Sequence, residues 1–522
     1  MEFGFLSILP ALVAIVLAIA TRQVILSLFV AVWLGATFIY SFNPAVGIMR
    51  TLDEFILGSA TDGWNAGILI FTMIIAAAIG LVTRSGGAQA IAEALARKAK
   101  TPRAGMLAAW FMGLVIFFDD YGSCLIAGNT SRPITDKLRV SREKLSYIVD
   151  STAAPVATIA VISTWVGYEM GMISEGFATV GVEVAPYLVF LQSIPYRFYS
   201  LFAMAFILIL AFTMRDFGPM YNAEIRARTT GKLLRDGAVP LSAGDTAELQ
   251  VKEGVPLRWI NFVLPLLTII GGTIIGLYYN GGGAETGTFL DAIGNADASV
   301  VLLWSSTAGL VVALFLVLVQ RILTLGEAMD TVMNGAKSVF TALVILVLAW
   351  SLSAVSSTLG AADYLSPLVA AAVPVWLVPF IVFVVACMVA FATGTSWGTM
   401  GILTPMAVPI AYAFGVDYIM IPTVAAVLTG AIFGDHCSPI SDTTILSSTG
   451  SSCDHIDHVR TQLPYAIVTA VIAGVFGFIP AGFGIPWYVS LVLGVAAMYV
   501  IVKVVGKSTM GSTVDVGQKA KA

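Results

Sequence analysis

Residues 434–444 read Gly434-Asp435-His436-Cys437-Ser438-Pro439-Ile440-Ser441-Asp442-Thr443-Thr444. This stretch places two carboxylates, a histidine and several hydroxyls inside an otherwise apolar segment of helical length. A charge held at the centre of a bilayer costs roughly 2.5–3.5 kcal/mol even on the lenient insertion scale. Two carboxylates beside a helix-breaking proline are therefore expected to serve a function, and we interpret the stretch as half of an ion-binding site.

The composition indicates a polytopic α-helical membrane protein. Hydrophobic residues make up 58% of the 522 residues and charged residues only 11%, whereas soluble domains carry about 25% charged residues. Apolar runs of about 20 residues, long enough to span a bilayer as helices, recur along the whole chain. No basic tract with interleaved aromatic residues occurs in the sequence. We therefore expect the lipid bilayer, and not nucleic acid, as a partner.

The cysteines and histidines follow no familiar metal-binding pattern. A zinc site formed by Cys437, Cys453, His455 and His458 is conceivable, but their spacing matches no common set of zinc ligands. We expect neither a transition metal nor a cofactor.

Hydropathy predicts spans along the whole chain, two of which contain a proline that breaks them. The expected spans are 5–20, 24–41, 65–83, 143–170 (broken at Pro155), 198–213, 259–279, 299–319, 339–358, 375–392, 418–448 (broken at Pro439), 464–482 and 488–504. Amphipathic pieces are expected near 44–58 and 321–337.

The distribution of basic residues predicts a re-entrant hairpin. The connectors 84–103 and 132–148 are both rich in Lys and Arg, so both should lie on the cytoplasmic side. This requires residues 105–131 to enter the membrane and return, with residues 119–122 at the tip. The same assumption is made for 375–413. In both places the alternative is a broken helix that crosses the membrane completely.

An internal repeat relates the two halves. Gly122-Ser123 aligns with Gly398-Thr399 at an offset of 276 (398 − 122). Pro155 aligns with Pro439 at an offset of 284 (439 − 155), so the second copy carries eight extra residues. Because one copy would start outside and the other inside, we predict inverted repeats, which are common in secondary transporters and place the site near the midplane.

The predicted fold is an all-α polytopic membrane protein with two inverted repeats, re-entrant hairpins, broken helices and about 11–13 transmembrane segments. The expected units are a first repeat with a cytoplasmic loop at 1–253, a second repeat at 254–484, and an extra C-terminal helix and polar tail at 485–522.

The hairpin tips and the breaks carry the oxygen atoms that a small hard cation such as Na⁺ requires. The predicted ion-binding residues are Asp119, Asp120 and Ser123 at one tip; Thr395, Ser396 and Thr399 at the other; Asp150, Ser151, Thr152 and Thr158 at the first break; and Asp435, Ser438, Ser441, Asp442 and Thr443 at the second. Buried carboxylates can also take up protons, so Na⁺ and H⁺ would compete for one negative site. The expected proton-coupling residues are Asp442, Asp119 and His436.

Several candidates also have a purely structural interpretation. Asp150 could be a solvated carboxylate at a helix end, one of the two tip carboxylates could cap a half-helix, and His436 could be an interior hydrogen-bond partner. Residues 454–458 are expected to form a solvated cytoplasmic loop, and Glu169 is expected at the membrane interface.

These polar stretches resemble the NhaC-type sodium/proton antiporter family, within the larger ion transporter superfamily. The matching residues are 118–122, 132–136, 141–155, 394–399 and 434–444, in both repeats. The resemblance implies a homodimeric antiporter of the bacterial inner membrane, in which hairpins and broken helices move against a scaffold. It leaves the substrate open, since some similar proteins exchange organic acids with Na⁺ and H⁺.

The preferred hypothesis is exchange of Na⁺, or Li⁺, for H⁺. The alternative is a Na⁺- or H⁺-coupled transporter or exchanger of a small organic acid or amino acid. An enzyme is not expected, because Ser441-Asp442 with His436 is the only approximation to the nucleophile and base of a membrane hydrolase.

Overall fold

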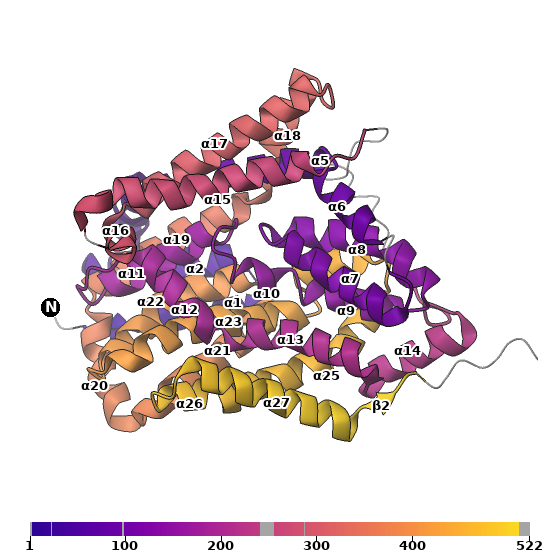
Figure 1. The fold of residues 1–522 in the computed structure, drawn as a ribbon. Helices are drawn as coiled ribbons and strands as arrows, with labels where there is room; N and C mark the ends of the chain where they lie inside the picture. The colour runs from indigo at the N-terminus through magenta and orange to yellow at the C-terminus, as the bar shows by residue number, and fades with distance from the viewer. Residues whose placement is uncertain (1–2, 22, 97–98, 241–254, 287, 511–522) are drawn as a thin grey trace, which may run out of the picture.

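The computed structural model describes residues 3–21, 23–96, 99–240, 255–286 and 288–510 (Figure 1). Apart from a two-stranded antiparallel ladder of β1 (Arg215–Asp216) and β2 (Lys507–Ser508), these residues form helices and their connections. Among them, eight helices are long and apolar enough to cross a membrane, and two bent helix pairs raise the number to ten. The predicted polytopic helical class is confirmed.

The described residues before position 240 form the helices α1 to α14. They are α1 (Leu9–Thr21), α2 (Val24–Ile39), α3 (Pro44–Arg50), α4 (Leu57–Thr61), α5 (Gly63–Arg84), α6 (Gly87–Ala96), α7 (Pro102–Val115), α8 (Asp120–Lys137), α9 (Arg142–Asp150), α10 (Ala154–Ala157), α11 (Val166–Ala178), α12 (Pro186–Ser193), α13 (Phe198–Thr213) and α14 (Gly218–Thr230).

The described residues after it form the helices α15 to α27. They are α15 (Ile260–Asn280), α16 (Phe289–Asn295), α17 (Ala298–Val319), α18 (Leu325–Ser338), α19 (Phe340–Thr358), α20 (Ala361–Ala372), α21 (Val378–Thr393), α22 (Ser396–Tyr412), α23 (Met420–Cys437), α24 (Asp442–Gly450), α25 (His455–Ile472), α26 (Ile479–Gly482) and α27 (Trp487–Val505).

The two predicted hairpins correspond to the pairs α7–α8 and α21–α22, whose helices pack against each other. Residues Val375–Thr393, which include α21, are long and apolar enough to cross a membrane, whereas α7 is shorter. Helix α7 has 14 residues and rises about 21 Å, too little to cross a hydrocarbon core of about 30 Å. The hairpins approach from opposite ends of the molecule (Figure 1), as expected for inverted repeats. Gly394 lets the second hairpin turn, because its φ of +70° is a conformation that L side chains rarely adopt.

The two tips are built in the same way. The Asp119 carboxylate caps α8 by accepting a hydrogen bond from Gly122 N at 2.7 Å. The Thr395 hydroxyl caps α22 by accepting one from Gly398 N at 3.5 Å. Both pairs are separated by the predicted offset of 276 (395 − 119 and 398 − 122). The sequence repeat is therefore a structural repeat down to the helix caps.

The two broken segments are also present, but they differ in length. In the second repeat the chain leaves α23 at Cys437 and re-enters a helix at Asp442. In the first repeat it is interrupted at 151–153 and again at 158–165, with the short α10 between. Pro155 lies in the first turn of α10, where its missing N–H costs no helical hydrogen bond.

The two segments predicted to be amphipathic, near 44–58 and 321–337, are not isolated surface helices. Residues 44–61 turn by 118° from α2. The piece expected at 321–337 contains α18, which with α19 forms a single candidate span of 34 residues, Leu325–Thr358. Helix α18 packs on α5 through Ala328, Thr331 and Gly335. Together with α15 and α17, these helices form a layer along one side of the molecule (Figure 1).

The repeats interlock around the breaks. Helix α8 of the first hairpin packs on α24 of the second repeat, and α22 of the second hairpin packs on α11 of the first. At the first of these crossings Gly128 and Gly450 allow the backbones to meet, since a Cβ on Gly450 would lie 2.5 Å from the Cys124 carbonyl oxygen. The hairpin tips are thereby held against the broken helices of the opposite repeat.

This crossing generates a stability prediction. Gly450→Ala should destabilise the protein by about 1–3 kcal/mol, because the new methyl group overlaps a backbone that cannot move aside. The matched control is Gly271→Ala, where no atom lies within 4 Å of the added Cβ and higher helix propensity favours the substitution. Thermal unfolding in detergent measures both. An unchanged unfolding temperature for Gly450→Ala would show that the α8–α24 crossing has room for a methyl group and would contradict the prediction.

Candidate functional site

A cavity of about 340 Å³ lies where the first hairpin tip meets the second break. Its wall combines residues of both tips, of both broken segments and of the α18–α19 junction: Asp119, Asp120, Tyr121, Thr164, Thr395, Trp397, Asp442, Ser338, Val339, Thr341, Ala342, Ile345, Ile445 and Leu446. Three carboxylates therefore border one cavity, although they come from segments in opposite halves of the chain.

Asp435 does not line this cavity, but it is buried and connects the second break to the second tip, where Thr395 and Trp397 line the cavity. Ser396 Oγ donates to Asp435 Oδ2 at 2.9 Å, and Ser441 Oγ donates to Oδ1. Ser441 Oγ also lies 3.0 Å from Thr443 Oγ1. The carboxylate is thus held by hydroxyl groups only, with 5% of Asp435 exposed.

Asp120, at the first tip, carries an oxygen atom with no partner. Trp165 Nε1 donates to Asp120 Oδ1 at 3.1 Å. Asp120 Oδ2 and Ser123 Oγ are buried and make no hydrogen bond within the described residues. An unpartnered buried carboxylate oxygen is costly, so this position is suited to a bound proton or cation.

The irregular residues 158–165 of the first broken segment contact both tips. Thr164 N donates to the Phe118 carbonyl at 3.0 Å, and Thr164 Oγ1 donates to Asp119 Oδ1 at 3.4 Å. The centre of the Trp165 ring lies 4.7 Å from that of the Trp397 ring at the second tip. Thr164 and Trp165 therefore connect the two hairpins at the centre of the molecule.

Asp442 has an environment different from that of Asp435. It is the first residue of α24, its side chain faces the cavity, and Tyr121 OH donates to its Oδ2 at 3.5 Å. Among the described residues, no Lys or Arg forms an ion pair with Asp120, Asp435 or Asp442. The site therefore carries negative charge that no basic side chain balances.

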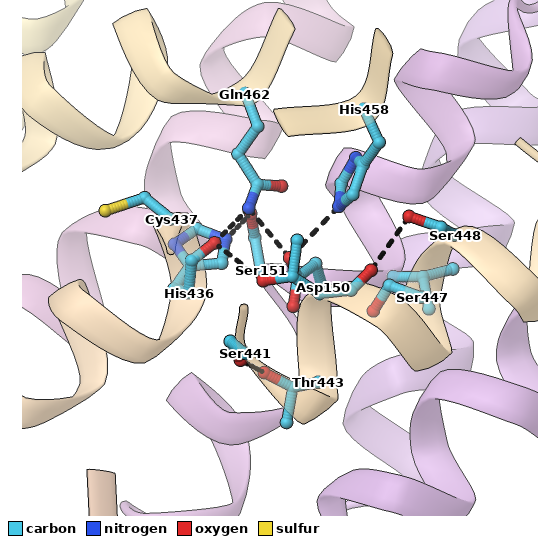
Figure 2. A network of polar contacts seen from close by, with 12 residues as sticks. Asp150, Ser151, His436, Cys437, Ser441, Thr443, Ser447, Ser448, His458 and Gln462 are labelled. Atoms are coloured by element: carbon cyan, nitrogen blue, oxygen red, sulfur yellow. Dashed lines mark hydrogen bonds and ion pairs between the residues drawn. The ribbon is translucent and has the colours of Figure 1, made fainter. Parts of the chain in front are cut away.

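Asp150 belongs to a second buried network, which Figure 2 shows. His458 Nε2 lies 3.1 Å from Asp150 Oδ2, and Gln462 Nε2 donates to the same oxygen at 2.7 Å. The interpretation of Asp150 as a solvated helix end is wrong, because the residue is 1% exposed. The expected solvated loop at 454–458 is also wrong in part, since His458 is fully buried.

His436 joins this network from the second break. Its Nε2 lies 2.8 Å from Ser151 Oγ and its Nδ1 lies 2.6 Å from Tyr199 OH, while its carbonyl accepts a hydrogen bond from Gln462 (Figure 2). Both ring nitrogens are occupied by hydroxyls. The structure thus places His436 between the two breaks, as an interior hydrogen-bond partner.

Four other predicted residues use their hydroxyls in a different way. Three hydroxyls donate to backbone carbonyls: Thr152 to Ile148 at 2.8 Å, Thr399 to Thr395 at 2.9 Å, and Ser438 to Phe391 at 2.9 Å. The fourth, Thr158, lies in a separate cluster with Glu169 and Arg197.

Sequence reasoning missed this cluster. Glu169, which was expected at the membrane interface, is fully buried inside the protein, and its Oε2 lies 2.6 Å from Arg197 Nη1. The available signal was Arg197 itself, an isolated basic residue in the apolar stretch 185–213. His458 and Gln462 were missed as well, although their spacing of four residues puts both on one face of α25.

Comparison with known proteins places this geometry in a family. The model of the Na⁺/H⁺ antiporter family matches residues 156–478. A Haemophilus influenzae protein with no assigned function is 34% identical over 91% of each chain. The Bacillus subtilis malate-2H⁺/Na⁺-lactate antiporter is 39% identical over 104 residues, covering 19% of this chain and 22% of that one.

The fold also resembles a solved transporter. The Alcanivorax borkumensis YdaH transporter superposes with a TM-score of 0.57 at 15% identity, covering 84% of this chain and 90% of that chain. The spanning helices and the bacterial relatives indicate a multi-pass protein of the inner membrane. Because the family model matches more than half of the 522 residues, the chain belongs to the Na⁺/H⁺ antiporter family.

Proposed function

We propose that this antiporter exchanges Na⁺ for H⁺ at a site centred on Asp435. The observation that carries the proposal is a buried carboxylate that hydroxyls hold and no basic side chain among the described residues neutralises. Oxygen atoms are the ligands that hard cations prefer, and Ser396, Ser441 and the unpartnered Asp120 Oδ2 supply them nearby.

Exchange follows from competition for this negative charge. A buried carboxylate is costly unless a proton or a cation neutralises it, so the site is occupied by one or the other. During transport the hairpins and the broken helices would move as one unit, because Thr164 and Trp165 contact both tips. Asp119 and Asp442 face the cavity and would pass the cation to Asp435. His436 would support the break without carrying the proton.

Transport of a small organic acid is the second candidate. The cavity, at about 340 Å³, is larger than a single cation needs, and one relative carries malate and lactate by name. The carboxylates in its wall would repel an organic anion unless a cation entered first. Coupled entry of Na⁺ and an anion is therefore the form this alternative would take.

Exchange can be measured in proteoliposomes that carry a pH gradient. Addition of Na⁺ should dissipate the gradient in the wild type and not in Asp435→Asn, Asp442→Asn or Asp119→Asn. Asparagine also caps helices well. A loss of exchange in Asp119→Asn would therefore result from the missing negative charge and not from a missing helix cap. The control is Asp236→Asn, whose side chain is 81% exposed in an i,i+4 pair. Normal exchange in Asp435→Asn and Asp442→Asn would disprove the site.

The same vesicles separate the two candidates. Dissipation by Na⁺ or Li⁺ alone, with no effect of added malate, lactate or amino acids, supports simple exchange. If no cation acts until an organic solute is present, the simple exchange proposal is wrong and the second candidate holds.

Two serines near Asp435 give a sharper test. Ser396→Ala removes a hydrogen bond to the carboxylate, and bonds to charged groups are worth about 1.5–3 kcal/mol. Losing this bond favours the protonated form of the carboxyl group over the ionised form, so the proton competes better with Na⁺. The Na⁺ concentration for half-maximal exchange should therefore rise roughly ten- to hundredfold. Ser438→Ala removes bonds to the backbone alone, one donated to the Phe391 carbonyl and one accepted from Ile440 N, so it should alter stability more than Na⁺ dependence. Equal Na⁺ dependence in both variants would contradict the role of Ser396.

A further inference from the structure

Arg197 is a buried cation inside the first repeat. Its residue is 0% exposed, and its guanidinium lies 4.8 Å from the centre of the Phe190 ring. The side chain starts just before α13 and reaches the irregular segment that follows α10. A charge at such depth is retained only when it is fully compensated.

Oxygen atoms surround the guanidinium. Arg197 Nη1 donates to the Thr158 carbonyl and, at 2.6 Å, to Thr158 Oγ1, and the same nitrogen lies 2.6 Å from Glu169 Oε2. Arg197 Nη2 donates to Ser193 Oγ at 2.9 Å. One carboxylate, two hydroxyls and one carbonyl form this pocket, which is the donor set of a hard-cation site.

The pocket is related by the repeat to Asp442, which faces the cavity beside the proposed Na⁺ site. Thr158 aligns with Asp442 at the same offset of 284 that relates Pro155 to Pro439 (442 − 158 and 439 − 155). At the second break Asp442 has a Tyr121 hydroxyl and no basic partner among the described residues. At the first break the equivalent position contacts Arg197.

We propose that Arg197 is a tethered cation that permanently fills the cation pocket of the first repeat, so that only the second repeat binds an exchangeable cation. The covalent link prevents the guanidinium from leaving, and Glu169 balances its charge. The pocket therefore stabilises the first break in every transport state without competing for Na⁺. This inference rests on the proposed function only for the identity of the cation.

Removal of Arg197 should expose the pocket to Na⁺. In Arg197→Ala, Glu169 and Thr158 remain, and the number of Na⁺ ions bound per chain, measured with radioactive Na⁺ on purified protein, should rise by one. The matched control is Arg197→Ala with Glu169→Gln, which lacks the negative charge and should gain none. A folded Arg197→Ala variant that gains no Na⁺ would overturn the proposal.

Two further measurements keep this test independent of the proposed function. In an Asp435→Asn background the gain of one Na⁺ on removing Arg197 should persist. If Asp435→Asn alone still binds Na⁺, the proposed transport site is wrong, while the increment caused by Arg197→Ala still decides the inference. If Arg197→Ala unfolds readily, NaCl should raise its unfolding temperature more than choline chloride does. Equal effects of the two salts would show a merely structural ion pair and overturn the proposal.

Discussion

Negative charge without a basic counterpart is the constraint on which this structure depends. Asp120, Asp435 and Asp442 come from a hairpin tip and a broken helix of different repeats, and the described residues provide no Lys or Arg to neutralise them. Such charge is tolerated in a membrane only if a proton or cation occupies the site. The hairpins, the breaks and the glycine crossing of α8 and α24 all serve to bring these carboxylates together.

The other buried charges show that the imbalance is local. Lys144 Nζ, in α9, lies 2.5 Å from Asp216 Oδ1, Glu169 pairs with Arg197, and Glu224 pairs with Arg228. These pairs neutralise charge within the protein, so no bound ion is required to balance them. The same fold thus treats buried charge in two ways: these pairs have fixed basic partners, whereas the carboxylates of the proposed site would take an exchangeable one.

Much of this arrangement could be predicted from the sequence, because the repeat is long and its polar motifs are few. The basic connectors predicted the hairpins, the alignment of Gly122-Ser123 with Gly398-Thr399 predicted the repeat, and the helix caps Asp119 and Thr395 occupy equivalent positions. The partners of the buried charges could not be predicted in the same way. Hydropathy and loop charge treat residues one at a time, whereas Lys144 and Arg197 lie near helix ends and reach inward along their side chains. His458 was misplaced for the same reason.

The central claim is that Na⁺ and H⁺ compete for the carboxylate of Asp435, and the most direct test is proton release on Na⁺ binding. Purified protein in a weakly buffered detergent solution should release protons when NaCl is added, and not when choline chloride is added. Asp435→Asn should release none. Na⁺ binding without proton release, or release that persists in Asp435→Asn, would contradict the account.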